Sequence, residues 1–245
     1  MLAFVPVARF HILGMSNAPP HDAARFTRIL LVRHGETAAN AKMIIQGSRL
    51  DCTLNEKGIS DAVALGYSIR SANNRFCCAS SALARARQTA LLVTGDRRDM
   101  DNHVCVQGLN EIDYGSVWDG RSLKEHFDDV RSLAMRWRKG ETHVRCPHGG
   151  ESPDDVLLRS KRALFALVDE RKADVVVVVA HNFVNKILLS HFLFGSIRYM
   201  HLIDQDNTCV NIIDISHDKE KVRVRTLNDV SHLSSAQADK SRSSI

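Results

Sequence analysis

The sequence predicts an α/β fold, a three-layer α/β/α sandwich with a mostly parallel central sheet. Short apolar runs alternate along the chain with segments of helical periodicity, as expected for strands that are connected by covering helices. The five valines at 175–179 lack the polar alternation of a half-solvated strand, so this strand should be covered on both faces. Nothing in the 245 residues resembles an interdomain linker, so we expect one domain with a large core.

The expected strands are short apolar runs bounded by turn-forming residues. They fall at residues 28–33, 75–79, 103–107, 174–180, 208–215 and 221–227. The polar segment 217–220 should join the last two strands as a hairpin.

The expected helices carry apolar residues on one face, as Leu83, Ala86, Ala90 and Val93 do in the second of them. They fall at residues 56–70, 82–94, 121–138, 153–171 and 183–194. Ser152 as N-cap and Pro153 in the first helical position mark the start of the fourth helix. By its position, the stretch 111–150 is expected to form a lid over the site, with Trp118, Arg121 and Trp137 available to contact a substrate.

Charged and imidazole side chains follow three of the predicted strands. Arg33 and His34 follow the apolar run 29–32, and His181 follows the valine strand. Arg85 stands in the first turn of a helix, where the helix dipole favours anions. Ligands of open parallel sheets bind at the carboxyl ends of the strands. A guanidinium fork beside a nucleophilic imidazole suits a phosphate dianion.

Several segments, in the expected order, resemble the histidine phosphatase superfamily, in its phosphoglycerate-mutase-like branch. They are Arg33-His34-Gly35-Glu36-Thr37 with Asn40, then 46–47, 54–58, 81–90, 109–115, 149–152 and 180–181. No single segment is decisive, but their ordered sum, over roughly residues 28 to 228, is highly specific. The resemblance implies a phosphoglycerate-mutase-like fold.

The resemblance also implies a role for each matching residue. His34 would be the nucleophile that forms a phosphohistidine, and Glu111 would be the acid that protonates the leaving oxygen. Three further side chains would hold the phosphoryl oxygens: Arg33, Arg85 and His181. A second group would contact the substrate: Asn40, Gln46, Gly47 and Asn182. Phosphoryl transfer depends on positioning and charge neutralisation, which two arginines and a second imidazole can supply without a metal.

These roles require particular protonation states. Glu111 must be protonated to act as an acid, and a nearby phosphate dianion favours that form. His34 must present an unprotonated nitrogen, so its other nitrogen needs a hydrogen-bond acceptor that fixes the tautomer. Glu36, directly after the turn, is expected to brace backbone amides or a neighbouring base.

One residue departs from the family pattern. In most of the family a glycine follows the second histidine, whereas here Asn182 follows His181. Asparagine still offers an amide N–H and tolerates unusual backbone angles better than most residues.

Composition excludes several other classes. The net charge of +5 is mild, and the basic residues are scattered without interleaved aromatics, which argues against a nucleic-acid partner. No apolar stretch reaches the length of a membrane span, so no membrane partner is expected. The six cysteines have neither disulfide nor zinc-site spacing, so we expect a reducing compartment, no metal and no cofactor.

The domain is expected at residues 27–232, between an N-terminal extension at 1–26 and a disordered tail at 233–245. The extension is either unstructured or an organelle-targeting segment. We expect a cytoplasmic protein unless this extension directs it to an organelle. Both a monomer and a homodimer are compatible with the sequence.

We expect a metal-independent phosphatase acting on a small phosphorylated metabolite, with sugar phosphates and bisphosphates as candidates because basic residues outnumber aromatics. The first alternative is a phosphoglycerate mutase, which must exclude water from its phosphoenzyme. The phosphoglycerate mutases that this chain resembles have a proline-rich lid, but the lid region of this chain holds only Pro147 and Pro153. The remaining alternative is a non-catalytic module that binds a phosphorylated ligand or a protein. It would be expected if His34 or Glu111 were missing.

Overall fold

The computed structural model describes residues 25–72, 76–95, 103–171 and 173–233. Most of the predicted N-terminal extension and nearly all of the predicted tail lie outside these ranges, so the domain boundaries stay predictions.

The described residues form one six-stranded sheet with the strand order β3-β2-β4-β1-β5-β6. Its strands are β1 (Phe26–Arg33), β2 (Cys77–Ser80), β3 (Val104–Cys105), β4 (Val175–Ala180), β5 (Val210–Ser216) and β6 (Val222–Asp229). β1, β2, β3 and β4 are parallel to one another, whereas β5 runs antiparallel to both β1 and β6. The predicted α/β fold with a mostly parallel sheet is confirmed.

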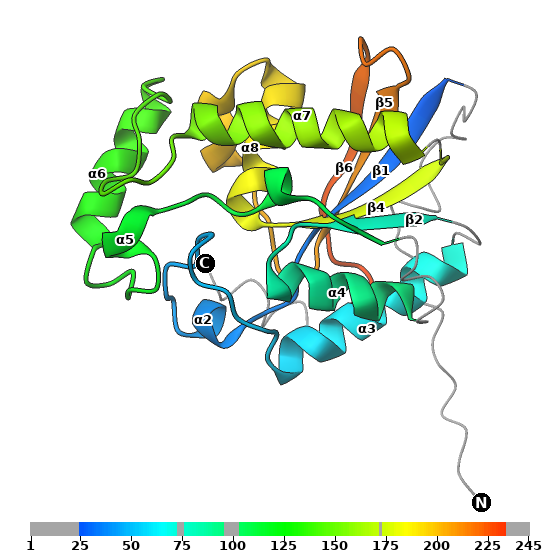
Figure 1. The fold of residues 1–245 in the computed structure, drawn as a ribbon, viewed down its shortest axis with the longest axis horizontal. Helices are drawn as coiled ribbons and strands as arrows, with labels where there is room; N and C mark the ends of the chain where they lie inside the picture. The colour runs from blue at the N-terminus through cyan, green and yellow to red at the C-terminus, as the bar shows by residue number, and fades with distance from the viewer. Residues whose placement is uncertain (1–24, 73–75, 96–102, 172, 234–245) are drawn as a thin grey trace, which may run out of the picture.

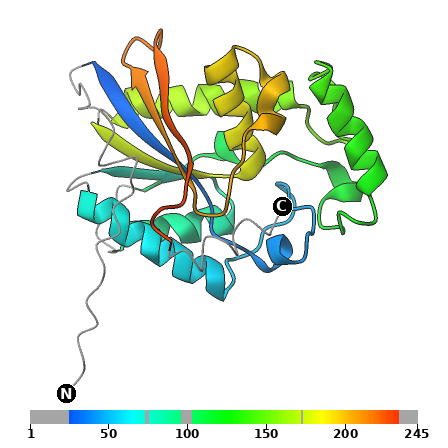
Figure 2. The ribbon, with the colours of Figure 1, turned by 180° about the vertical axis from the view of Figure 1, so that it is seen from behind.

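Helices cover both faces of the sheet, as Figures 1 and 2 show. α3 (Glu56–Ala72) and α4 (Ala84–Thr94) lie on one face, and α7 (Pro153–Arg171) and α8 (Asn182–Phe194) lie on the other. Successive residues of β1 serve the two cores in turn: Leu30 and Val32 pack in the cluster that includes α3 and α4, and Ile29 and Leu31 in the cluster that includes α7 and α8. This alternation explains why β1 is apolar throughout its middle.

The register of the parallel strands aligns their carboxyl ends. Arg33 of β1 lies opposite Ala180 of β4, and Ser80 of β2 lies opposite Val179. The His34 N–H continues the ladder by donating to the Ala180 carbonyl at 3.1 Å. The residues that follow β1, β2 and β4 therefore emerge at one edge of the sheet.

The predicted helix at 121–138 begins later than expected, as α6 (Phe127–Arg138). Gly120 has a φ of +84°, and the residues after it form turns and also pair with a distant segment. The Ile45 N–H donates to the Arg121 carbonyl at 2.8 Å, and the Leu123 N–H donates to the Met43 carbonyl at 3.0 Å. This pairing takes the backbone groups that a helix would use, so the prediction was wrong over residues 121–126.

The remaining elements are short. They are α2 (Ala38–Ala41), α5 (Gly115–Trp118) and the two 3-10 helices at Gln107–Leu109 and Ile197–Leu202. The predicted strand at 103–107 is reduced to the two residues of β3. Among the described residues, none of the helices is both long and apolar enough to cross a membrane.

Candidate active site

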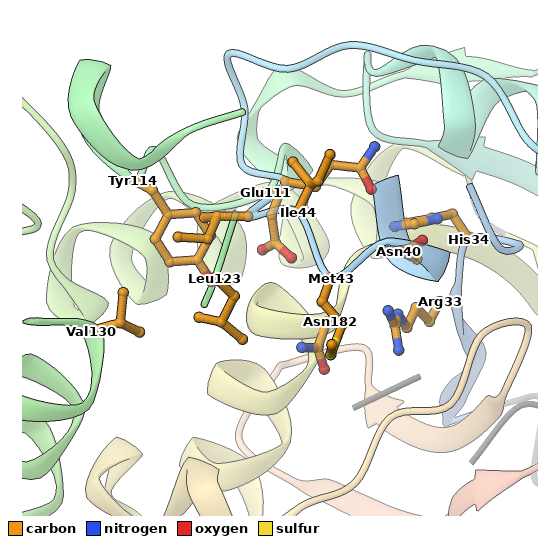
Figure 3. A pocket seen from close by; sticks show the side chains of 12 residues that line it. Arg33, His34, Asn40, Met43, Ile44, Glu111, Tyr114, Leu123, Val130 and Asn182 are labelled. Atoms are coloured by element: carbon orange, nitrogen blue, oxygen red, sulfur yellow. The ribbon is translucent and has the colours of Figure 1, made fainter. Parts of the chain in front are cut away.

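A cavity of about 190 Å³ opens at the carboxyl edge of the sheet (Figure 3). It is lined by Arg33, His34, Asn40, Met43, Ile44, Ile45, Gln46, Glu111, Tyr114, Leu123, Val130 and Asn182. Figure 3 shows two ends to this lining. The polar end is formed by Arg33, His34 and Asn40, and the apolar end by Tyr114, Leu123 and Val130, while Met43 and Ile44 lie between the two.

His34 is buried at the polar end, and its tautomer follows from one contact. Its Nδ1 lies 2.7 Å from the Gly35 carbonyl oxygen, which can only accept a hydrogen bond. Nδ1 therefore carries the proton, and Nε2 keeps its lone pair. Burial, together with the charges of Arg85 and Arg33, holds the pKa of His34 well below its usual value. The neutral, nucleophilic form is thus the favoured one.

The backbone of His34 is held by a turn that precedes β5. The Asn207 side-chain amide donates to the His34 carbonyl at 3.0 Å, and the Thr208 N–H donates to the Arg33 carbonyl at 3.1 Å. Thr208 has a φ of 60°, which is unusual for a β-branched residue and costs free energy. Sequence reasoning missed both residues; the only local signal was a turn-forming asparagine just before a strand.

Two guanidinium groups lie around His34. Arg33 lines the cavity, and its Nη1 donates to the Gln205 carbonyl. Arg85 is fully buried, and it donates to the carbonyls of Leu50 at 2.9 Å and Gly47 at 3.1 Å. Burial lowers the pKa of each, although nearby Glu111 opposes this effect. The Nε atoms of both arginines are buried without a hydrogen-bond partner in the described part of the chain, so both can still bind an anion.

The second histidine, His181, caps α8, and its ring centroid lies 5.1 Å from that of His34. A hydrogen bond of 2.6 Å joins its Nε2 to the Ser81 hydroxyl. Its Nδ1 is buried and has no partner among the described residues. Burial and the charge of Arg85 place the pKa of His181 well below its usual value.

Glu111 reaches the cavity from the loop after the 3-10 helix Gln107–Leu109, and its carboxyl group meets the start of α8. It accepts from the N–H groups of Ile112 at 3.0 Å, Phe183 at 3.1 Å and Val184 at 3.3 Å. These donors favour the charged form, but burial outweighs them and raises the pKa of Glu111. Figure 3 shows Glu111 between the polar and apolar ends. A carboxyl group so placed can deliver a proton to a leaving oxygen.

Arg159 of α7 fixes the loop that carries Glu111. It forms a two-pronged ion pair with Glu151, at 2.7 and 2.9 Å. It also donates to three backbone carbonyls at and just before that loop, those of Gly108, Asn110 and Glu111. The segment 149–152 thus contributes Glu151 to this support. Sequence reasoning did not single out Arg159, because it acts through the backbone of a segment about fifty residues away.

The four predicted substrate contacts differ in position. Asn40, Gln46 and Asn182 line the cavity, whereas Gly47 does not. The Asn40 Oδ1 accepts from the Thr37 N–H at 3.2 Å, which leaves the amide NH₂ for a ligand. Gly47 bonds instead to two side chains: its carbonyl accepts from the Arg85 guanidinium, and its N–H donates to the Asp119 carboxylate. A Cβ at this position would lie 2.6 Å from the Ile112 carbonyl, so glycine is needed for packing.

Asn182 begins α8 in a helical conformation, so this position needs no glycine. Its side chain reaches the cavity, and its Oδ1 is buried without a partner among the described residues. The family's usual glycine is thus replaced here by a polar lining group.

The tryptophans of the insertion do not reach the cavity, contrary to the prediction. Trp118 and Trp137 are each 5% exposed and belong to the core, and Trp137 donates its indole N–H to the Val144 carbonyl at 2.8 Å. Arg121 does not line the cavity either. The insertion contributes Leu123 and Val130 to the lining instead.

Glu36 was expected to brace backbone amides or a neighbouring base, and its carboxylate contacts side chains. Its carboxylate accepts from the Asn55 amide at 2.8 Å and pairs with Lys57 at 3.3 Å. No group of three His, Cys, Asp or Glu side chains gathers as a metal-binding set within the described ranges.

The site therefore combines a neutral histidine with a free nitrogen, two arginines, a second histidine and a carboxyl group of raised pKa. These are groups suited to a phosphate-handling enzyme. Residues 29–229 match the histidine phosphatase superfamily (branch 1), and the chain belongs to that family.

Its relatives include named phosphatases. The chain is 32% identical, over 85% of its length and 84% of the relative's, to a metal-independent phosphoserine phosphatase of Arabidopsis thaliana. It is 30% identical to the 2-carboxy-D-arabinitol-1-phosphatase of Triticum aestivum, over 82% of this chain but only 39% of that protein. Among solved structures, YhfR of Bacillus stearothermophilus superposes with a TM-score of 0.72 at 30% identity, covering 84% of this chain and 98% of the other.

Proposed function

We propose that the protein is a metal-independent phosphatase that hydrolyses a small phosphorylated metabolite through a phosphohistidine at His34. The observation that carries this proposal is the free Nε2 of a neutral, buried His34 at the polar end of a cavity that also holds Glu111. The Arabidopsis relative, whose name describes a metal-independent phosphatase, supports it.

The first half-reaction breaks the ester bond. His34 Nε2 attacks phosphorus, the bond from phosphorus to the alcohol oxygen breaks, and Glu111 gives its proton to that oxygen. The alcohol leaves, and the phosphoryl group remains on His34. Arg33 and Arg85 balance the charge of the phosphoryl oxygens during the transfer, and neutral His181 can donate a hydrogen bond to one of them.

The second half-reaction restores the enzyme. Glu111, now a carboxylate, accepts a proton from a water molecule that attacks the phosphohistidine. The bond from phosphorus to Nε2 breaks, and inorganic phosphate leaves. A cavity of about 190 Å³ suits a small substrate better than a macromolecular one.

The test is phosphate release from a panel of phosphorylated metabolites with EDTA present. We expect release to persist in EDTA and to vanish in His34→Ala, while the matched control His217→Ala, at an exposed turn, keeps full activity. Loss of activity in EDTA would contradict a metal-independent reaction. Interconversion of phosphoglycerates without release of phosphate would show a mutase. Inactivity towards every compound would favour a non-catalytic module that binds a phosphorylated ligand or a protein.

A further inference from the structure

We propose that the apolar end of the cavity is a subsite for the leaving alcohol, so that the preferred substrate is the monophosphate ester of an uncharged, largely apolar alcohol. This inference rests on the proposed function and narrows its substrate class. It replaces the expectation of a compact, highly charged sugar bisphosphate.

The position of Glu111 tells which part of the substrate occupies each end. The phosphoryl group must lie beside His34, at the polar end, and the leaving oxygen must lie beside Glu111 to receive its proton. Figure 3 shows Tyr114, Leu123 and Val130 on the far side of Glu111 from His34 and Arg33. The carbon atoms attached to the leaving oxygen therefore extend towards the apolar end.

The apolar end offers a charged group no partner. Its lining side chains are Tyr114, Leu123 and Val130, and the charged or imidazole members of the cavity lining are Arg33, His34 and Glu111. Burial raises the pKa of Tyr114 well above its usual value, so its phenol stays neutral. A second phosphate or a carboxylate bound there would lose its hydration without gaining an ion pair, which is costly.

Backbone contacts fix the walls of the apolar end relative to each other. Residues 43–45 and 121–123 form the pair of hydrogen bonds described above, with an isolated bridge between Ile44 and Ser122. Tyr114 packs edge-on against Phe183 of α8, with a centroid separation of 6.3 Å. The subsite is thus preformed, and it should select its ligand by polarity and size.

The experiment compares kcat/KM for straight-chain alkyl phosphates, from ethyl to butyl, with that for phosphoserine and a hexose bisphosphate. Each methylene that is buried should raise kcat/KM about fourfold. Butyl phosphate should therefore exceed both charged substrates. p-Nitrophenyl phosphate serves as the general indicator of phosphatase activity.

Two variants test whether this end sets the preference. Leu123→Lys should lower kcat/KM for butyl phosphate at least tenfold and raise it for the bisphosphate. Val130→Thr keeps the side-chain shape and should lower the advantage of butyl over ethyl phosphate several-fold. Leu158→Lys, at a position 75% exposed on α7, is the matched control and should change neither ratio.

Higher kcat/KM for phosphoserine or the bisphosphate than for butyl phosphate would overturn the subsite while leaving the phosphatase proposal intact. An equal loss of kcat/KM on all substrates in both Leu123→Lys and Val130→Thr would also overturn the subsite and leave the phosphatase proposal intact. Failure to release phosphate from any substrate, p-nitrophenyl phosphate included, would overturn the proposed function and this inference with it.

Discussion

At the scale of single residues, the site combines two shifts of opposite sign. Burial lowers the pKa of His34 and raises that of Glu111. Both shifts favour the neutral form, which each residue needs for its proposed role, nucleophile and acid respectively. Desolvation of the cavity thus prepares both groups at once.

These shifts predict how activity depends on pH. Glu111 must be protonated, so kcat/KM for an alkyl phosphate should fall as the pH rises through its raised pKa. His34 must be unprotonated, so activity should persist well below the usual histidine pKa and be lost only when the pH falls through its lowered value. Glu111→Gln should lower the rate about a hundredfold or more and remove the alkaline fall.

The measurement is a pH profile of kcat/KM for wild type and Glu111→Gln. p-Nitrophenyl phosphate is the control substrate, because its leaving group needs little protonation and should respond weakly to Glu111→Gln. An alkaline fall of the same size in both proteins would show that Glu111 is not the acid.

Sequence reasoning was effective for residues that stand at strand ends. His34, Arg33 and His181 come together because parallel strands end at a common edge of the sheet. Arg85 lies in the first turn of α4, the helix that follows β2. It was ineffective for Gly47, Asn207 and Arg159, whose contacts join segments distant in the chain. Such contacts depend on the folded geometry and leave no local periodic signal.

At the scale of elements, α7 acts on the proposed active site indirectly, because its Arg159 contacts the loop that carries Glu111. The Arg159 side chain touches Glu151 and three backbone carbonyls around Glu111, and it does not line the cavity. Arg159 is therefore a positioning residue for the proposed acid.

Arg159→Met should lower kcat/KM for alkyl phosphates about a hundredfold, because a displacement of the acid by about 1 Å has a cost of that size. The effect on p-nitrophenyl phosphate should be much smaller. The control is Arg162→Met, an exposed position on the same helix. The measurement is kcat/KM for both substrates in each variant, with thermal unfolding recorded alongside. Equal losses on both substrates would indicate a general structural role and contradict this assignment.

Elements with a clear period were predictable, and the insertion was not. The valine strand and helices α3, α4, α7 and α8 lie within two residues of their expected bounds, because burial on one or both faces sets their pattern. Within 111–150, the sequence pattern predicted a helix from residue 121. The positive φ of Gly120 and the hydrogen bonds to residues 43–45 instead delay the start of that helix to Phe127. The two tryptophans, which were expected from their position to be available for substrate contact, pack instead in the hydrophobic core.

At the scale of the whole molecule, the fold separates two tasks. The parallel strands and their helices place the proposed phosphate-binding groups at one edge, and residues 111–150 supply part of the wall that the leaving group would meet. The first task follows from residues at strand ends and at a helix start, whereas the second depends on contacts between segments far apart in the chain. Fold and family could therefore be inferred from sequence, while the proposed substrate preference rests on the arrangement of the cavity.

The central claim is that His34 carries the phosphoryl group between the two half-reactions. The most direct measurement is to mix the enzyme with phosphate-labelled substrate, quench within one turnover in alkali, and locate the label by peptide mapping. We predict label on the peptide that contains His34, stable in alkali and lost in acid, present in His217→Ala and absent in His34→Ala. Label on another residue, or turnover that continues in His34→Ala, would contradict the account.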